Sequence, residues 1–227
     1  MFVATLAHEL RQPLSAMLAA VDVVQVAPHI DAARRAAHVM RRQIGQMSRL
    51  VEDLVDAARW ANGKVTLRKR RIDLRDVMRD AAADVGTLAD ECSQELSITV
   101  GPDALWIDGD SQRLLQAISN LLRNAVSYTQ TGGRISMTVE RIASTVRLHV
   151  VDTGRGIEAE ALPHVFDLFS QTRPHEGNGL GVGLNVVREI VLLHGGTIEA
   201  RSDGAWKGTE FIVSLPLAEM PADMLDA

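Results

Sequence analysis

A heptad repeat runs through residues 33–58, where apolar residues recur at alternating steps of four and three. Its members are Ala33, Ala37, Met40, Ile44, Met47, Val51, Leu54 and Ala58. This repeat predicts a long α-helix with a single apolar seam. An earlier stripe at helical spacing, Phe2–Val24, predicts a first helix that ends before Pro28 and is kinked at Pro13. An Asn62–Gly63 turn ends this helical hairpin.

The two predicted helices would share only one apolar stripe, which is little support for a hairpin of this length. We therefore expect a homodimer in which two hairpins form a four-helix bundle. The alternative is a hairpin that packs on the C-terminal part of its own chain.

After Lys64 the apolar period changes from that of a helix to that of strands alternating with helices. We predict strands over 64–70, 95–100, 134–141, 145–152, 196–202 and 209–217, with helices over 74–91, 111–128 and 184–194. Neighbouring strands separated by short turns indicate an α+β fold with an α/β sandwich, and not a doubly wound parallel sheet. The predicted domains are residues 1–62 and 63–227.

The amino-acid composition limits the classes of function and the cellular compartment that we expect for this chain. The 227 residues include 24 Lys and Arg against 29 Asp and Glu, a net charge of −5 that argues against nucleic-acid binding. The single cysteine, Cys92, suits a reducing compartment. No apolar run is long enough to span a bilayer, and no signal peptide is recognisable. We expect a soluble, cytoplasmic segment without membrane contact, cut from a longer protein that can itself be membrane-anchored.

Asp152 ends the apolar row of the predicted strand 145–152 and shares its buried face. A carboxylate in that position needs hydrogen-bond donors. Gly154 and Gly156 follow, and they allow a tight turn or a close approach to a ligand. An ordinary capped turn also explains Asp-Thr-Gly. An aspartic protease would need a second such loop, and the chain has only one.

The predicted helix 111–128 places Asn120, Asn124 and Ser127 on one face. Asparagine is a poor residue for a helix interior, so this polar row suggests a site for a hydrated cation. A solvated helix face is the alternative.

Four alternating glycines, Gly177, Gly179, Gly181 and Gly183, come just before an apolar helix. Free backbone N–H groups at a helix start favour phosphate, although the spacing matches neither the dinucleotide fingerprint nor the P-loop. A flexible loop is the alternative. Taken together, a carboxylate for a base, asparagines for a cation and glycines for phosphates suit one nucleotide.

In their order along the chain, these segments resemble the sensor histidine kinases of two-component signalling. The resemblance covers Phe2–Leu217 and rests on six short motifs. They are FVATLAHELRQPL (2–14, phosphoacceptor box), NLLRNAVSYT (120–129, asparagine box), VDTGRGI (151–157), FDLF (166–169, phenylalanine box), GNGLGVGL (177–184, second glycine box) and GTEF (208–211).

The resemblance implies a dimerising phosphotransfer hairpin followed by an ATP-binding sandwich of the gyrase and heat-shock-chaperone class. It implies that His8 attacks the γ-phosphoryl group of ATP, that Glu9 assists, and that a response-regulator receiver domain accepts the phosphoryl group. ATP and Mg²⁺ are the implied cofactors, with Asn124 at the metal. The implied nucleotide contacts are Asn120, Asn124, Tyr128, Asp152, Gly154, Gly156, Ile157, Gly179, Gly181, Gly183, Leu184 and Thr209.

The chain departs from the family pattern at three positions. Ser127 stands where many members carry lysine, and Gln12 stands where Thr or Asn commonly supports dephosphorylation of the partner. The arginine often found after the phenylalanine box is absent, and we expect Arg173 to contact the γ-phosphate instead. Two alternatives stay open: a dimeric scaffold that binds nucleotide without phosphoryl transfer, and another ATPase of the same class. The hairpin that carries His8 argues against the second.

Overall fold

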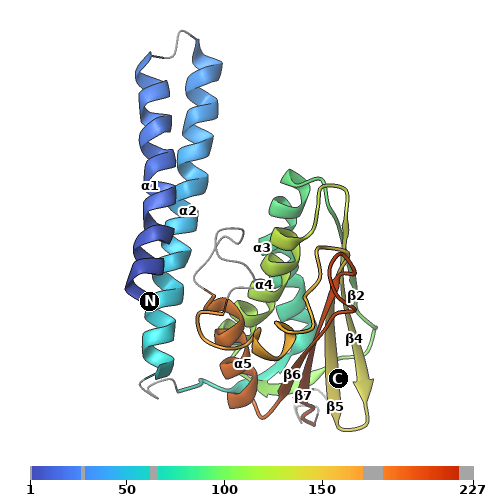
Figure 1. Ribbon diagram of the computed structural model, residues 1–227. Coiled ribbons are helices and arrows are strands. Elements are labelled where there is room, and N and C mark those ends of the chain that lie inside the picture. The colour runs from blue at the N-terminus through green and yellow to red at the C-terminus, as the bar shows by residue number, and fades with distance from the viewer. Residues whose placement is uncertain (1, 27–28, 62–65, 171–180, 220–227) are drawn as a thin grey trace.

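The computed structural model describes residues 2–26, 29–61, 66–170 and 181–219 (Figure 1). A helical hairpin of α1 (Phe2–Val26) and α2 (Ile30–Ala61) precedes an α/β sandwich, which lies beside the lower half of the hairpin (Figure 1). This confirms the predicted α+β class. The predicted domain boundary, between residues 62 and 63, lies outside the described residues and stays a prediction. None of the described helices is long and apolar enough to cross a membrane.

Within one chain, the hairpin buries small residues and leaves much of its apolar seam outside. Helix α1 continues through the buried Pro13, and Ala20 and Ala36 are buried between the helices. The heptad residues Ile44 and Val51 are 56% and 51% exposed. A two-helix hairpin has only one internal interface, so a second apolar face is left uncovered.

The sandwich contains a five-stranded sheet in the order β2-β4-β5-β7-β6. Its strands are β2 (Glu95–Thr99), β4 (Arg134–Ile142), β5 (Thr145–Asp152), β6 (Thr197–Arg201) and β7 (Thr209–Pro216). Strands β2 and β4 pair parallel, and every other pair in this sheet is antiparallel. Helices α3 (Leu74–Glu91), α4 (Ser111–Tyr128) and α5 (Gly183–Leu193) cover one face of the sheet (Figure 1). The aliphatic core lies between these two layers.

Aspartate caps fix where two of the helices begin. Asp73 accepts a hydrogen bond from the Arg75 N–H at 3.0 Å, and Asp110 accepts one from the Arg113 N–H at 3.2 Å. Both satisfy backbone donors that a first helical turn leaves unpaired. The bounds of α3 and α4 agree with the predicted 74–91 and 111–128, whereas α5 lies one residue earlier than predicted.

The strand predicted over 64–70 is wrong in its described part. Residues 66–69 are a linker without strand structure, and β1 spans Arg70–Asp73. It pairs antiparallel with β3 (Trp106–Gly109), which the sequence analysis did not predict. A short 3₁₀ helix, η1 (Leu162–His164), was also not predicted. Four-residue strands place two side chains on each face, which is too few for a clear alternating pattern.

Candidate nucleotide-binding site

Asp152 lies at the end of β5 with 5% of its surface exposed. Its Oδ1 accepts a hydrogen bond from the Gly154 N–H at 2.8 Å, and the Thr209 N–H also donates to the carboxylate. Burial raises the pKa of Asp152 to about 6, although both N–H groups favour the charged form. A buried carboxylate with two backbone donors can accept further hydrogen bonds, so it is suited to a donor supplied by a ligand.

Gly154 joins three segments around that carboxylate. A Cβ at this position would lie 2.3 Å from the Tyr128 carbonyl oxygen, which no side chain tolerates. The same carbonyl accepts from the Arg155 N–H at 3.0 Å, and the Gly154 carbonyl accepts from the Gly208 N–H at 3.1 Å. Glycine at 154 therefore lets the ends of α4 and β5 and the start of β7 meet at Asp152.

Two further contacts hold the segment after Gly154. Gly156 has a φ of +67°, and a Cβ there would lie 2.1 Å from the Gly204 carbonyl oxygen. The Ser202 hydroxyl accepts from the Ile157 N–H at 2.9 Å and donates to the Gly208 carbonyl at 2.7 Å. The sequence analysis missed Ser202, because a serine beside Asp-Gly reads only as a turn.

The Arg155 guanidinium is another group that the sequence analysis missed. It lies over the Tyr128 ring, 5.1 Å from the ring centroid. A basic residue between two glycines gives no pattern from which this contact could be predicted. The contact places a cation next to a residue of the expected nucleotide set.

Asn120 lies in the middle of α4 and faces the start of α5. A Cβ on Gly183 would be 3.8 Å from Asn120 Nδ2, which is buried without a hydrogen-bond partner among the described residues. Buried amides are rarely left unpaired, so a polar ligand group suits this position. Asn124, one turn later, is partly buried, whereas Ser127 is exposed.

These asparagines fit a divalent cation only in company with phosphate. An amide oxygen is a ligand that Mg²⁺ accepts, and Mg²⁺ commonly combines one or two protein ligands with substrate phosphates. Among the described residues, no group of three His, Cys, Asp or Glu side chains could hold a metal. A cation held by these asparagines would therefore need phosphate oxygens to complete its coordination.

The phenylalanine box is attached to α5 and to the sheet. The Phe169 N–H donates to the Gly181 carbonyl at 3.0 Å, which joins the end of the phenylalanine box to the residue before Val182 and α5. Asn185 donates to the Phe166 carbonyl at 3.1 Å, and the Phe166 ring packs edge-on against Phe211 at 6.2 Å.

The predicted residues thus form two groups along α4. Asp152, Gly154 and Thr209 gather near Tyr128, and Gly183 lies beside Asn120. The nine residues from Asn120 to Tyr128 span about 12 Å of helix, a length comparable to that of a nucleoside triphosphate. Leu184 and Ile157 pack partly buried against the core.

For four predicted site residues, the residue or its side chain lies outside the described part of the structure. Arg173 and Gly179 lie outside the described residues. His8 and Glu9 lie on α1, and their side chains also fall outside the described part. The roles expected for these four residues stay predictions.

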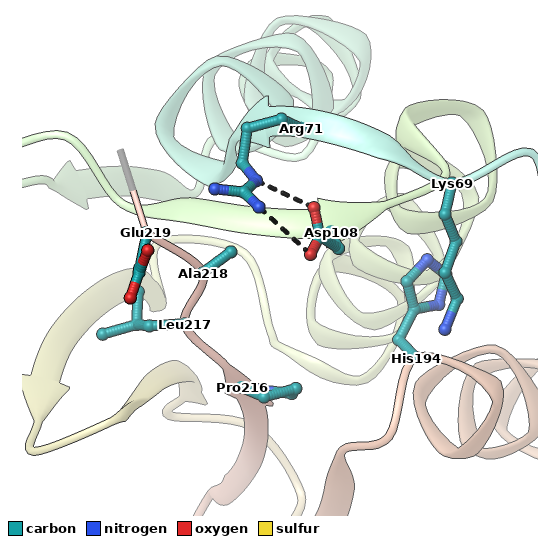
Figure 2. A pocket seen from close by; sticks show the side chains of 8 residues that line it. All are labelled: Lys69, Arg71, Asp108, His194, Pro216, Leu217, Ala218 and Glu219. Atoms are coloured by element: carbon teal, nitrogen blue, oxygen red, sulfur yellow. Dashed lines mark hydrogen bonds and ion pairs between the residues drawn. The ribbon is translucent and has the colours of Figure 1, made fainter. Parts of the chain in front are cut away.

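A distinct cavity lies elsewhere on the described part of the chain. It has a volume of about 350 Å³, and its lining includes Lys69, His194 and Glu219 (Figure 2). None of the predicted nucleotide contacts lines it.

Two family models match this chain, one over the hairpin and one over most of the sandwich. Residues 1–63 match the His Kinase A (phospho-acceptor) domain. Residues 109–219 match the histidine kinase-, DNA gyrase B- and HSP90-like ATPase. The fold and the site thus define a phosphoacceptor hairpin joined to an ATPase domain of this class. The chain belongs to the sensor histidine kinases of two-component systems.

Curated relatives agree with this assignment. The chain is 31% identical over 232 residues to the sensor protein DivL of Caulobacter vibrioides, covering 98% of this chain and 29% of the relative. It is 30% identical over 225 residues to the sensor histidine kinase RppB of Synechocystis, covering 97% of this chain and 49% of the relative. The chain therefore spans no more than about half the length of these two relatives.

Solved structures share the whole fold. Full-length ShkA in complex with AMPPNP has a TM-score of 0.70 at 28% identity, covering 96% of this chain and 46% of that one. Histidine kinase ThkA in complex with the response regulator protein TrrA has a TM-score of 0.70 at 22% identity, covering 95% of this chain and 61% of that one. At that identity the second similarity concerns the fold alone.

Proposed function

We propose that the chain is the autophosphorylating core of a two-component histidine kinase. It would transfer the γ-phosphoryl group of ATP to His8 and then to the receiver domain of a response regulator. The observation that carries this proposal is a pair of buried groups along α4. Asp152 lies beside the Tyr128 end of this helix, and the Asn120 amide nitrogen, at its middle, has no hydrogen-bond partner among the described residues. Both occur in a chain whose first helices match the phosphoacceptor domain.

In this proposal the adenine amino group donates to Asp152, with Tyr128, Ile157 and Thr209 around the base. Asn120 and Asn124 would hold Mg²⁺ together with the phosphates, and bound Mg²⁺ supplies charge neutralisation. The N–H groups at Gly181, Gly183 and Leu184 would face the phosphates, which suits the positive end of α5.

The phosphoryl step assigns His8 the role of nucleophile. A neutral imidazole nitrogen of His8 attacks the γ-phosphorus in line, and the bond from that phosphorus to the β–γ bridging oxygen breaks as ADP leaves. The other ring nitrogen loses its proton, for which we propose Glu9 as the acceptor. Charge neutralisation and positioning are the main demands of such a loose transition state.

A homodimer and a cytoplasmic location are part of the same proposal. Leu18, Ile44 and Val51 are 66%, 56% and 51% exposed on the hairpin, and pairing with a second hairpin would cover such residues. A cytoplasmic location follows from ATP as the phosphoryl donor.

One observation favours a second candidate, a nucleotide-binding scaffold without transfer. Ser127 is exposed in the last turn of α4, where the family resemblance calls for a lysine. A neutral residue there removes one positive charge that would face phosphate.

The decisive experiment incubates the chain with γ-labelled ATP and Mg²⁺, and compares it with His8→Ala and with His38→Ala. His38 is a matched control because it is an exposed histidine on α2. We expect an acid-labile, base-stable label on the unmodified chain and on His38→Ala, and none on His8→Ala. Nucleotide binding without label on the unmodified chain would support the scaffold, and absence of binding would contradict both candidates.

A further inference from the structure

The linker between the hairpin and the sandwich is held by the two helices that carry the nucleotide site. Lys69 Nζ donates to the Leu193 carbonyl at 2.8 Å, at the C-terminal end of α5. The Arg68 N–H donates to Asp110 Oδ2 at 2.9 Å, at the start of α4. A cation at a helix C-terminus and a carboxylate at a helix N-terminus are both favourable placements.

Asp110 joins the linker, α4 and α5 in one network. Its carboxylate caps α4 and holds the linker, while its own backbone N–H donates to His194 Nε2 at 2.9 Å. Burial by itself would raise the pKa of Asp110, but the N–H groups of Arg68, Arg113 and Gln112 hold it below its usual value. The carboxylate therefore stays ionised while it holds the linker and the start of α4.

His194 is the part of the network that belongs to α5. It is 4% exposed, and its Nδ1 lies 2.7 Å from the Ile190 carbonyl while Nε2 accepts from Asp110. These two partners require the neutral ring with its proton on Nδ1, and burial lowers the pKa of His194 accordingly. Gly109 makes room for the ring, since a Cβ there would lie 3.3 Å from His194 Cδ2.

Asp110 and His194 lie at the ends of α4 and α5 that are far from the candidate nucleotide contacts Asn120 and Gly183. Asn120 lies ten positions after Asp110 along α4, a rise of about 15 Å, and α5 runs its whole length between Gly183 and His194. Lys69 and His194 line the cavity of Figure 2, and Asp152 is not among its lining residues. The network is therefore placed to affect the hairpin's position without touching the nucleotide.

Helix α5 also contacts the hairpin directly. It packs against α2, where Leu50 is 3% exposed and belongs to the same apolar cluster as Val187 and Ile190. The hairpin is thus held to α5 at two places, by side-chain packing and by the linker. A change at either place would alter where His8 stands relative to the nucleotide groups.

We propose that Asp110, His194 and Lys69 are positioning residues that set the approach of the nucleotide site to His8. They act on the rate of phosphoryl transfer from bound ATP and leave nucleotide affinity unchanged. This inference rests on the proposed function of His8.

The test uses the whole chain and three variants: Lys69→Met, His194→Leu and His194→Gln. Methionine keeps the apolar stem of Lys69 and removes its donor, at an exposed position where folding is not at risk. Glutamine at 194 offers an oxygen to the Asp110 N–H, whereas leucine offers none. Arg147→Met, exposed on the other face of the sheet, is the control.

The readouts are the rate of His8 labelling at saturating ATP and the affinity for ADP by calorimetry. We expect Lys69→Met and His194→Leu to slow labelling by about 10- to 100-fold with ADP affinity within about twofold of the unmodified chain. His194→Gln should recover most of the rate, and Arg147→Met should match the unmodified chain.

Two results would overturn the inference while the proposed function stands. They are an unchanged rate in Lys69→Met and His194→Leu, or a loss of ADP affinity that matches the loss of rate. If the unmodified chain carries no label on His8, the proposed function fails and this inference fails with it.

Discussion

Asp152 carries the clearest electrostatic signature of any residue in the candidate site. Its folded pKa is about 6 against a usual 3.8, so the folded chain binds this proton more tightly than the unfolded chain does. Stability is therefore lost as the pH rises from about 4 to about 6, by roughly 3 kcal/mol in all. A nucleotide amino group would offset that cost by donating to the carboxylate.

We predict that Asp152→Asn stabilises the nucleotide-free chain at pH 7.5 more than at pH 5, because asparagine has no charge to bury. The same change should weaken ADP binding about 10- to 100-fold, the usual effect of losing a charged hydrogen bond. Urea unfolding at both pH values and calorimetry with ADP check this, with the exposed Glu91→Gln as control. Equal gains at both pH values would contradict the pKa argument.

Gly154→Ala tests the close approach of β5 and α4. The added Cβ would lie 2.3 Å from the Tyr128 carbonyl oxygen and 2.8 Å from Asp152 Oδ1, so we expect a loss of about 1–3 kcal/mol in unfolding free energy. ADP affinity should fall as well. Gly101→Ala is the control, since nothing lies within 4 Å of its Cβ. Similar denaturation midpoints for the two variants would show that the turn relaxes freely.

Among the elements, α2 offers the most direct test of the proposed homodimer. Ile44 is 56% exposed on it, and we predict that Ile44→Glu converts a dimer to a monomer, because a charge would be buried between paired hairpins. Light scattering coupled to size exclusion measures the mass. Ile142→Glu, at a residue 37% exposed on β4, should leave the dimer intact. A monomeric unmodified chain would contradict the proposed bundle.

Local signals in the sequence predicted most elements well, and non-local pairing was what they missed. Asp110 and a strong helical period gave α4 its bounds, and alternation around one turn gave the β4–β5 hairpin. The β1–β3 pair was missed because its register links residues more than 30 positions apart. The parallel pairing of β2 with β4 was missed for the same reason, since it too links residues far apart in the sequence.

Prediction of the candidate site from the sequence was limited in the same way, because part of it depends on contacts that side-chain patterns do not reveal. Asp152 was identifiable because it ends an apolar row, but its donors are backbone N–H groups, which leave no mark on side-chain patterns. The expected hairpin seam was identified as apolar, yet Ile44 and Val51 face outward in the single chain. A second hairpin in the predicted homodimer would cover residues in that orientation.

For the whole molecule we predict two unfolding transitions, one that depends on protein concentration and one that depends on nucleotide. The hairpin transition should move to higher temperature with protein concentration, because a dimer dissociates as it unfolds. The sandwich transition should move with ADP and Mg²⁺ instead, by about 2.7 kcal/mol of stabilisation at a hundredfold excess over Kd. Calorimetry at two concentrations, with and without ligand, separates them. One transition that responds to both variables would show a single cooperative unit.

Lys69 and Glu219, at the two ends of the described sandwich, line the same cavity (Figure 2). A domain joined at neighbouring points can be cut out and replaced without stretching what surrounds it. We therefore expect the sandwich to be an exchangeable domain. Recombination at residues 69 and 219 would join it to the hairpin of a related chain and give chimeric proteins. Such chimeras would combine the hairpin of one parent with the nucleotide chemistry of another.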